Sequence, residues 1–377
     1  MRLLLLALFL ATPAWAQIDF TSNAGFQKTC ARYAVARPES LASDAEKIAY
    51  TLCSGVELLR SGAYAMRDPR LQRLDGEEAP QLVRGVLEGM LARIRATRGV
   101  LESVKGAGPY MRIEPGTWVI DLDGDGVVTP TERYFFWVPR RDVGVPPRAE
   151  QVDEYYRVFY AAPVIKVDRS DVYWALAYCH FAEAALNLVL AYDVSIGQGE
   201  PIVLLRDAER VRTSAYRNLL AGLQYSRRLR ESLAQETDDD FEWIHGPKQK
   251  NTSFPLVLDA QTFASWGELL GHLDALATGK TLLGGLVNAP VQVRDLSMGL
   301  CPPGMGINVQ KLFLDPIRQP ASRDAMRARC VKADAATPFT SLPKLIEASF
   351  ARTAPAAGKD PNLSGESVIL RHLYWVN

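Results

Sequence analysis

The sequence predicts a mainly α fold, a helical bundle-like domain with one inserted acidic loop and an irregular carboxyl-terminal part. Apolar residues recur at helical spacing over long stretches, whereas extended stretches are short and few. The 377 residues carry 43 Lys+Arg and 43 Asp+Glu, and 48% of them are hydrophobic, as in an ordinary globular protein. This length is compatible with one large domain or with two to three smaller ones. Because the charges balance, no nucleic-acid partner is expected.

The amino-terminal segment, residues 1–16, has the pattern of a secretory signal peptide. An apolar run over residues 3–10 is followed by an A-x-A cleavage site that ends at Ala16. The run is shorter than the roughly 20 residues that cross a membrane, and an uncleaved anchor or a buried first helix is the alternative. We expect residues 17–377 to form an exported α-helical domain with no membrane span. Arginine outnumbers lysine and alanine is abundant, as in bacteria of high genomic GC content, so the periplasm is the expected location and secretion the second.

Five cysteines follow the predicted signal peptide. In an oxidising compartment, their spacing favours two local disulfides, Cys30–Cys53 and Cys301–Cys330. Closing loops of this size stabilises a fold by about 3 kcal/mol each in the chain-entropy model. Cys179 lies within an apolar predicted helix, and we interpret it as a buried free thiol.

The helices are predicted from apolar residues that recur about one turn apart. In the first, Ile48, Leu52 and Val56 share one face, and Ser43 with Glu46 forms a capping box at its start. The predicted helices cover residues 43–64, 79–104, 171–192, 205–235 and 260–277, with a less regular one at 342–351. Two short stretches are expected to be extended, residues 117–120 and 164–167.

The connection at about residues 109–140 contains a dense acidic motif between the second and third helices. It reads Asp121-Leu122-Asp123-Gly124-Asp125-Gly126-Val127-Val128-Thr129-Pro130-Thr131-Glu132. These twelve residues resemble an EF-hand calcium loop. The resemblance implies carboxylates at loop positions one, three, five and twelve, a main-chain carbonyl at seven and a ligand at nine that often acts through water. The implied Ca²⁺ ligands are Asp121, Asp123, Asp125, Val127, Thr129 and Glu132.

The segments on either side of the motif differ from those of an EF-hand. Pro115-Gly116 excludes a helix that runs continuously into Asp121, so we expect the incoming arm to be the extended stretch 117–120. Thr129 can start a helix through Trp137, and in that helix Glu132 has a competing role as a capping residue. The chain shows one such loop, whereas calcium sensors usually pair two. A structural ion of weak affinity, with Kd of order 10⁻⁴–10⁻³ M, is therefore expected.

A polar stripe crosses the otherwise apolar third helix. His180, Glu183 and Asn187 lie three and seven residues apart and so share one helix face. They are interpreted as a satisfied polar network in a helical core; a ligand or transition-metal pocket that includes Cys179 and a membrane span are the alternatives. The aromatic cluster at residues 155–160 is assigned to core packing, with a binding groove as its alternative.

Two functional hypotheses follow from these features. The first is an exported protein that binds calcium, most simply as a structural ion, and acts by binding an unidentified protein or small molecule. It depends on the complete acidic motif and on the lack of G-x-S-x-G, H-E-x-x-H and P-loop signatures. The alternative is a periplasmic, hydrolase-like enzyme whose site is built from separate helices around His180 and Glu183.

Overall fold

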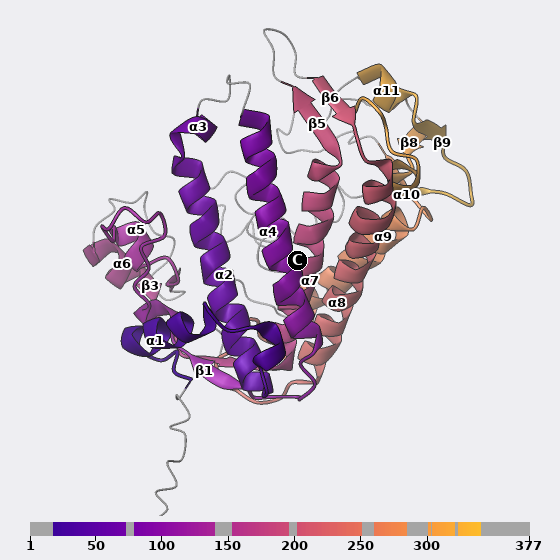
Figure 1. Ribbon diagram of the computed structural model, residues 1–377. Helices are drawn as coiled ribbons and strands as arrows, with labels where there is room; N and C mark the ends of the chain where they lie inside the picture. Colours follow the sequence, from indigo (N-terminus) through magenta and orange to yellow (C-terminus); the bar gives the residue numbers. More distant parts are fainter. Residues whose placement is uncertain are drawn as a thin grey trace, which may run out of the picture.

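The computed structural model describes residues 18–72, 79–139, 153–195, 202–250, 260–284, 301–302, 304–320 and 323–340. Long helices dominate these residues, so the predicted mainly α fold is confirmed (Figure 1). The predicted signal peptide, residues 1–16, and the predicted helix 342–351 lie outside the described residues. None of the described helices combines the length and the apolar character that a membrane crossing requires.

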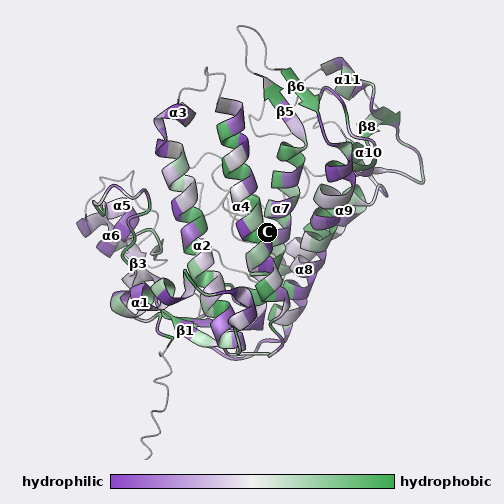
Figure 2. Cartoon of the chain, viewed as in Figure 1, coloured by the Kyte–Doolittle hydropathy of each residue, from purple (hydrophilic) through white to green (hydrophobic). Residues whose placement is uncertain are grey.

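The long helices lie side by side in the order of the sequence, with α7 in the middle. They are α2 (Asp44–Arg67), α4 (Ala79–Glu102), α7 (Arg169–Leu190), α8 (Tyr216–Gln235) and α9 (Ala260–Ala277). The central helix α7 packs against both α4 and α8, while α2 covers α4 and α9 covers α8. In Figure 2, α7 is apolar along most of its length, as a helix with neighbours on both sides must be.

The starts of several helices are set by capping side chains and not by the apolar periodicity. Ser43 caps α2 in the predicted capping box, and Asp168 caps α7 in a second one. The predicted start of the fourth helix at residue 205 is wrong, because β6 (Ile202–Leu205) pairs with β5 (Tyr192–Ser195) in an antiparallel hairpin. The chain turns helical only after Asp207, whose carboxylate accepts a hydrogen bond from the Arg210 N–H (2.8 Å). A π-helical turn, η3 (Arg210–Ala215), leads from there into α8.

Of the two predicted extended stretches, one forms a strand. β4 (Ile165–Val167) pairs antiparallel with β1 (Met111–Ile113) beneath the bundle. The stretch 117–120 is not a strand: Thr117 ends a 3-10 turn, η2 (Pro115–Thr117). The backbone of Val119 instead bonds to side chains of the helix α1 (Asn23–Tyr33), accepting from Gln27 Nε2 (2.9 Å) and donating to Asn23 Oδ1 (2.9 Å).

A helix that sequence periodicity did not predict, α1 (Asn23–Tyr33), packs against α2 and is joined to it by a disulfide. The predicted bonds Cys30–Cys53 and Cys301–Cys330 are both present, and Cys179 is free. The Cys301–Cys330 bond ties a small four-stranded sheet of order β10-β7-β8-β9. The remaining elements are η1 (Pro38–Ser40), α3 (Pro69–Gln72), α5 (Pro130–Arg133), β2 (Val138–Pro139), α6 (Asp153–Phe159), β3 (Tyr160–Ala161), β7 (Leu282–Gly284), β8 (Met305–Ile307), α10 (Val309–Leu314), α11 (Arg323–Arg327), β9 (Cys330–Lys332) and β10 (Phe339–Thr340).

Two apolar cores hold these elements together. The first core lies between α1, α2, α7 and the β1–β4 pair, and includes the buried residues Phe20, Leu101, Trp118 and Ile165. The second core lies between α8 and α9 and is built around residues such as Leu229. The first core is the one that reaches the acidic loop, because Trp118 stands just before it in the chain.

Removing the bond between α1 and α2 is expected to destabilise the protein. The double substitution Cys30→Ala and Cys53→Ala removes a crosslink between two cysteines that are 23 residues apart in sequence. Its loss should lower the free energy of unfolding by about 3 kcal/mol. Urea denaturation of the oxidised wild type and of this variant measures the difference. Cys179→Ala, which removes a thiol that forms no disulfide, serves as the control and should cost no more than about 1 kcal/mol. Equal stability of the double variant and the wild type would contradict the expectation.

Candidate metal centre

The acidic loop winds around its first residue, Asp121. The Asp121 carboxylate accepts hydrogen bonds from the N–H groups of Gly124 (2.7 Å) and Gly126 (2.9 Å). Both glycines have positive φ, 72° and 84°, a backbone conformation that side chains with a Cβ rarely adopt. The glycine expected at position six of the loop therefore has the sharp turn that the motif requires.

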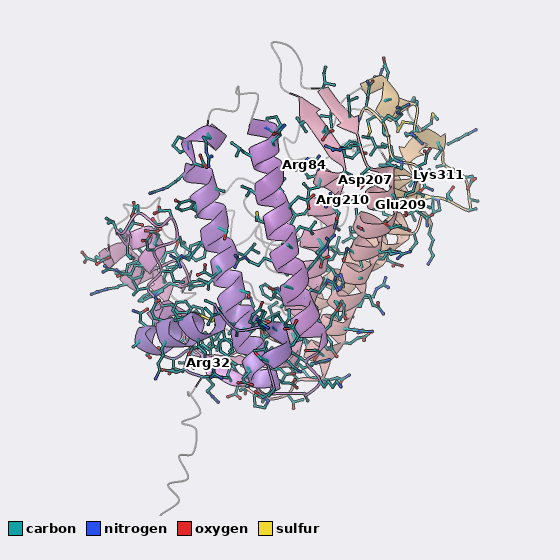
Figure 3. The ribbon with its side chains drawn as sticks, in the orientation of Figure 1. Arg32, Arg84, Asp207, Glu209, Arg210 and Lys311 are labelled. Atoms are coloured by element: carbon teal, nitrogen blue, oxygen red, sulfur yellow. A yellow bond between two sulfur atoms is a disulfide. The ribbon has the colours of Figure 1, made fainter. Side chains whose placement is uncertain are left out.

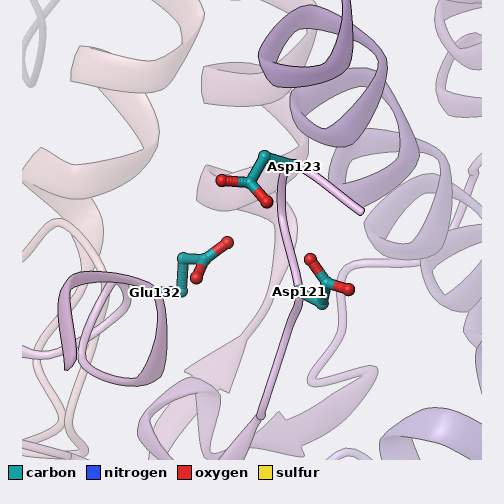
Figure 4. A group of neighbouring side chains, drawn as sticks. All are labelled: Asp121, Asp123 and Glu132. Carbon is teal, nitrogen blue, oxygen red and sulfur yellow. The ribbon is translucent and has the colours of Figure 1, made fainter. Parts of the chain in front are cut away.

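The loop brings three of its carboxylates together. One carboxylate oxygen of each of Asp121, Asp123 and Glu132 lies within 4.8 Å of the others. Figure 4 shows the three side chains directed toward a common centre beside a helix. These residues are positions one, three and twelve of the predicted ligand set.

Glu132 closes the loop from its far end and is 7% exposed. Its Oε1 accepts from the Leu122 N–H (2.9 Å), and its Oε2 accepts from the N–H and the hydroxyl of Thr129 (2.9 and 2.8 Å). Burial opposes the charge of this carboxylate, yet these hydrogen bonds hold its pKa below the usual value. Glu132 is thus ionised at neutral pH, and the predicted capping pair with Thr129 is present at the start of α5.

Asp125 and Val127, the ligands predicted at positions five and seven, lie toward solvent. The Asp125 carboxylate accepts from the Val127 N–H (2.8 Å) and pairs with Arg67 of α2 (3.0 Å), and both contacts lower its pKa. Arg67 also pairs with Asp123 (2.5 Å), and 52% of the Arg67 side chain is exposed. A guanidinium from a neighbouring helix therefore partly balances the four carboxylates of the loop.

The arms of the loop are not the two helices of an EF-hand. The turn η2 precedes it, so no helix runs continuously into Asp121, as Pro115-Gly116 predicts, although the incoming arm is not the expected strand. After it, α5 ends at Arg133, so the predicted helix through Trp137 is too long. The aromatic residues that follow fold back onto the core: Trp137 donates its Nε1–H to the Gly116 carbonyl (2.8 Å), and Phe136 packs edge-on against Trp118 with ring centroids 5.3 Å apart. Burying these rings is more favourable than adding further helical turns that would expose them.

A second group of carboxylates, which motif reading did not identify, surrounds Lys166 of β4. Oxygens of Asp168, Asp171 and Glu242 lie within 4.8 Å of one another. The Lys166 ammonium is 2.7 Å from Glu242 and 3.0 Å from Asp238. Burial opposes its charge, but these contacts raise the pKa of Lys166 above its ordinary value. No sequence spacing links these residues across the cluster, since they come from two segments, residues 166–171 and 238–242, that lie far apart in the chain.

Bound protons neutralise part of the negative charge of this second group. Burial raises the pKa of Asp171 well above its ordinary value, and the nearby charge of Asp168 adds to the effect. Burial also raises the pKa values of Glu236 and Glu242 to about 7, again with a contribution from Asp168. A lysine and bound protons thus offset the negative charge of the cluster.

The polar stripe of α7 forms the predicted satisfied network at Glu183 and Asn187, whereas the buried Nε2 of His180 has no hydrogen-bond partner among the described residues. Both oxygens of Glu183, which is 1% exposed, are engaged by Arg95 and Arg98 of α4. Asn187 accepts from Arg95 (3.1 Å) and from Arg210 (3.0 Å), which lies beside the upper part of α7 in Figure 3. Sequence periodicity placed the acceptors on one face but gave no sign of which arginines would reach them.

His180 lies at the edge of this network. Its Nδ1 is 2.7 Å from Asn218 Oδ1, and its ring stacks on Tyr225. Burial lowers the pKa of the imidazole, so His180 is neutral at pH 7. Cys179, its neighbour, has a pKa that burial raises to about 12, which keeps the thiol protonated.

The chain matches no protein-family model, no curated protein and no solved structure. The role of the acidic loop therefore has to be argued from the chemistry of its own residues.

The cluster around Lys166 is expected to make the protein more stable in mild acid. A carboxyl group whose pKa is raised on folding contributes stability that is complete below its unfolded value, near 4.5, and is lost as the pH rises through about 7. The free energy of unfolding should therefore fall between pH 5 and pH 8. Glu236→Gln, which mimics the protonated side chain, should flatten this dependence, whereas Glu231→Gln, at an exposed position of α8, should leave it unchanged. Denaturant titrations in EGTA at several pH values test this, and an unaltered slope in Glu236→Gln would contradict it.

Proposed function

We propose that this chain is an exported helical protein that binds one Ca²⁺ at the loop Asp121–Glu132, where the ion has a structural role, and that it acts by binding a partner. The observation that carries the proposal is the convergence of Asp121, Asp123 and Glu132 at loop positions one, three and twelve. A turn held by capping alone does not need three carboxylates in one place, because clustered negative charge is destabilising without a cation.

The donor set suits calcium better than other metals. The converging side chains offer oxygen and no nitrogen or sulfur, which is the preference of a hard cation. Calcium takes six to eight oxygens at roughly 2.3–2.6 Å in a flexible geometry, so a loop with additional carboxylate and main-chain oxygens fits it. Asp125, the Val127 carbonyl and Thr129 are the predicted sources of the remaining contacts.

A structural role fits the position of the loop. Its incoming end carries Trp118 and its outgoing end carries Phe136, and the two rings are in contact within the first core. An ion that draws the two ends of the loop together also fixes these rings. The arms of this loop do not form the helix pair that opens in a calcium sensor, since neither arm is a long helix.

The disulfides support an oxidising compartment. We place the protein in the periplasm, with secretion as the second location, in agreement with the predicted signal peptide.

The alternative, a hydrolase-like site at His180 and Glu183, has less support. The Glu183 carboxylate is engaged by two arginines, so it acts as the anion that holds α4 to α7. Among the described residues, the polar neighbours of the His180 ring are the Asn218 amide oxygen, 2.7 Å from Nδ1, and the Glu102 carboxylate, 3.7 Å from Nε2, so no Ser, Thr or Cys side chain is hydrogen-bonded to it.

Calcium is expected to stabilise the wild type and not a variant that lacks the last ligand. Glu132→Gln keeps an acceptor for the capping box, in which Gln substitutes for Glu, but loses the bidentate carboxylate. With about 10 mM CaCl₂ and a Kd of order 10⁻⁴–10⁻³ M, the wild type should gain about 1 to 3 kcal/mol relative to EGTA. Thermal melting should show a rise of a few degrees in wild type and none in Glu132→Gln or Asp121→Ala.

Glu154→Ala removes an exposed acidic residue outside the loop and serves as the matched control, so it should melt like the wild type with and without calcium. An equal shift in wild type and in Glu132→Gln, or no shift in any of the proteins, would contradict the proposed calcium site.

Arg67 is expected to compete with the ion for Asp123 and Asp125. Arg67→Gln removes the guanidinium and should tighten calcium binding about twofold to fivefold, because exposed ion pairs of this kind are weak. Arg60→Gln is the control, since Arg60 lies on the same helix and pairs with Glu57 instead. Chelator-competition titrations measure both affinities. Weaker calcium binding in Arg67→Gln would show that the arginine supports the site rather than competing for it.

A further inference from the structure

A cavity of about 210 Å³ lies within the first core. Its walls come mainly from α2, α7, the β1–β4 pair and the two segments that flank the acidic loop. Protein interiors are close-packed, and voids larger than a water molecule are few. An unfilled void of this size destabilises a fold, because the atoms around it lose packing partners. A guest that fills the cavity therefore supplies contacts that the surrounding side chains do not make with one another.

The wall of the cavity offers almost no polar atom to an occupant. The Thr51 hydroxyl, on α2, donates to the Lys47 carbonyl (2.9 Å) within the same helix. Asp171, the ionisable residue among those that line the cavity, accepts from the Asp168 N–H (2.9 Å). An occupant with a hydroxyl or amide group would lose its hydrogen bonds to water without replacement, so the wall selects a guest that has no such group.

Four aromatic rings contribute to this wall. Trp118 and Phe136 meet edge-on, with centroids 5.3 Å apart and an interplanar angle of 69°. Trp174 and Trp243 also meet edge-on, with centroids 6.2 Å apart and an angle of 63°. Aromatic faces and edges add stacking and edge-to-face contacts to the burial of area, which favours an aromatic ring over an open chain as the guest.

The size of the cavity and its opening set the size of the guest. An apolar cavity of about 150 Å³ in another protein stays dry and binds benzene, so this one has room for a benzene ring with methyl groups added. The cavity is partly open, and Leu52, Phe136 and Ala175 in its wall are only partly buried. A small guest can therefore enter without unfolding of the core.

We propose that this cavity is a binding site for a small aromatic hydrocarbon, of the size of a dimethylbenzene and without hydrogen-bonding groups. The inference rests on the proposed role as a binding protein and specifies the chemical class of its ligand. It does not require the calcium ion, because Asp121, Asp123 and Glu132 take no part in the cavity wall.

The compounds p-xylene and p-cresol form a matched pair of probes, since they have nearly the same shape and p-cresol carries a hydroxyl in place of one methyl group. Titrations of the full chain followed by ligand-observed NMR should give saturable binding of p-xylene. Binding of p-cresol should be about tenfold weaker or more, because its hydroxyl finds no partner in the cavity.

Filling the cavity tests the location of the site. Ala175→Leu on α7 and Leu52→Phe on α2 each add volume at the wall and should weaken p-xylene binding about tenfold or more. Ala185→Leu and Leu59→Phe are the controls, since both residues lie at exposed positions of the same two helices and outside the wall, and they should leave binding unchanged. Circular dichroism melting establishes that each variant is folded.

Three results would overturn the inference: no saturable binding of p-xylene by the wild type, equally tight binding of p-cresol, or p-xylene binding that is unchanged in both filled variants.

Each titration is performed in EGTA and again in CaCl₂, next to the melting experiment on the same samples. Binding of p-xylene in both buffers with no calcium shift in melting would support this inference while contradicting the calcium site. A calcium shift without p-xylene binding would overturn this inference alone.

Discussion

Glu132 is the residue on which the candidate site and much of the first core depend. Its two carboxylate oxygens are bonded to Leu122 at the start of the acidic loop and to Thr129 near its end, so one buried side chain closes the loop. The segments that leave this closure carry Trp118 and Phe136 into the core, where their rings meet. The loop is therefore part of the packing of the domain, and the proposed ion, held by Glu132, would act on both features at once.

Buried carboxylates are neutralised by different means in different parts of this molecule. Glu183 is balanced by arginines from α4, which tie two central helices together. The cluster around Lys166 relies on one ammonium group and on protons held at pKa values that burial raises to about 7. In the acidic loop, hydrogen bonds keep Glu132 ionised, and the exposed Arg67 supplies the nearby positive charge. An ionised cluster near the surface with a displaceable counter-charge is the arrangement of the three that suits a metal ion.

Local signals predicted the fold better than they predicted the site. Apolar periodicity and capping residues predicted most ends of the long helices to within three residues, apart from the start of the fourth helix, and cysteine spacing predicted both disulfides. The errors arose where tertiary contacts compete with local preference. Residues 202–205 pair with β5 as a strand instead of starting a helix, and Val119 donates its N–H to Asn23 of α1 instead of to a neighbouring strand. The motif identified Asp121, Asp123 and Glu132, but the contribution of Arg67 and the cluster around Lys166 come from distant segments, which no local spacing records.

The central claim is that the loop Asp121–Glu132 binds one calcium ion through the carboxylate of Glu132. Equilibrium dialysis with ⁴⁵Ca²⁺ tests it most directly, because it counts bound ions without relying on a change in stability. The account predicts one saturable ion per wild-type chain, with a Kd of order 10⁻⁴–10⁻³ M, and none over the same range in Glu132→Gln. A stoichiometry of zero in wild type, or an ion retained by Glu132→Gln with unchanged affinity, would contradict it.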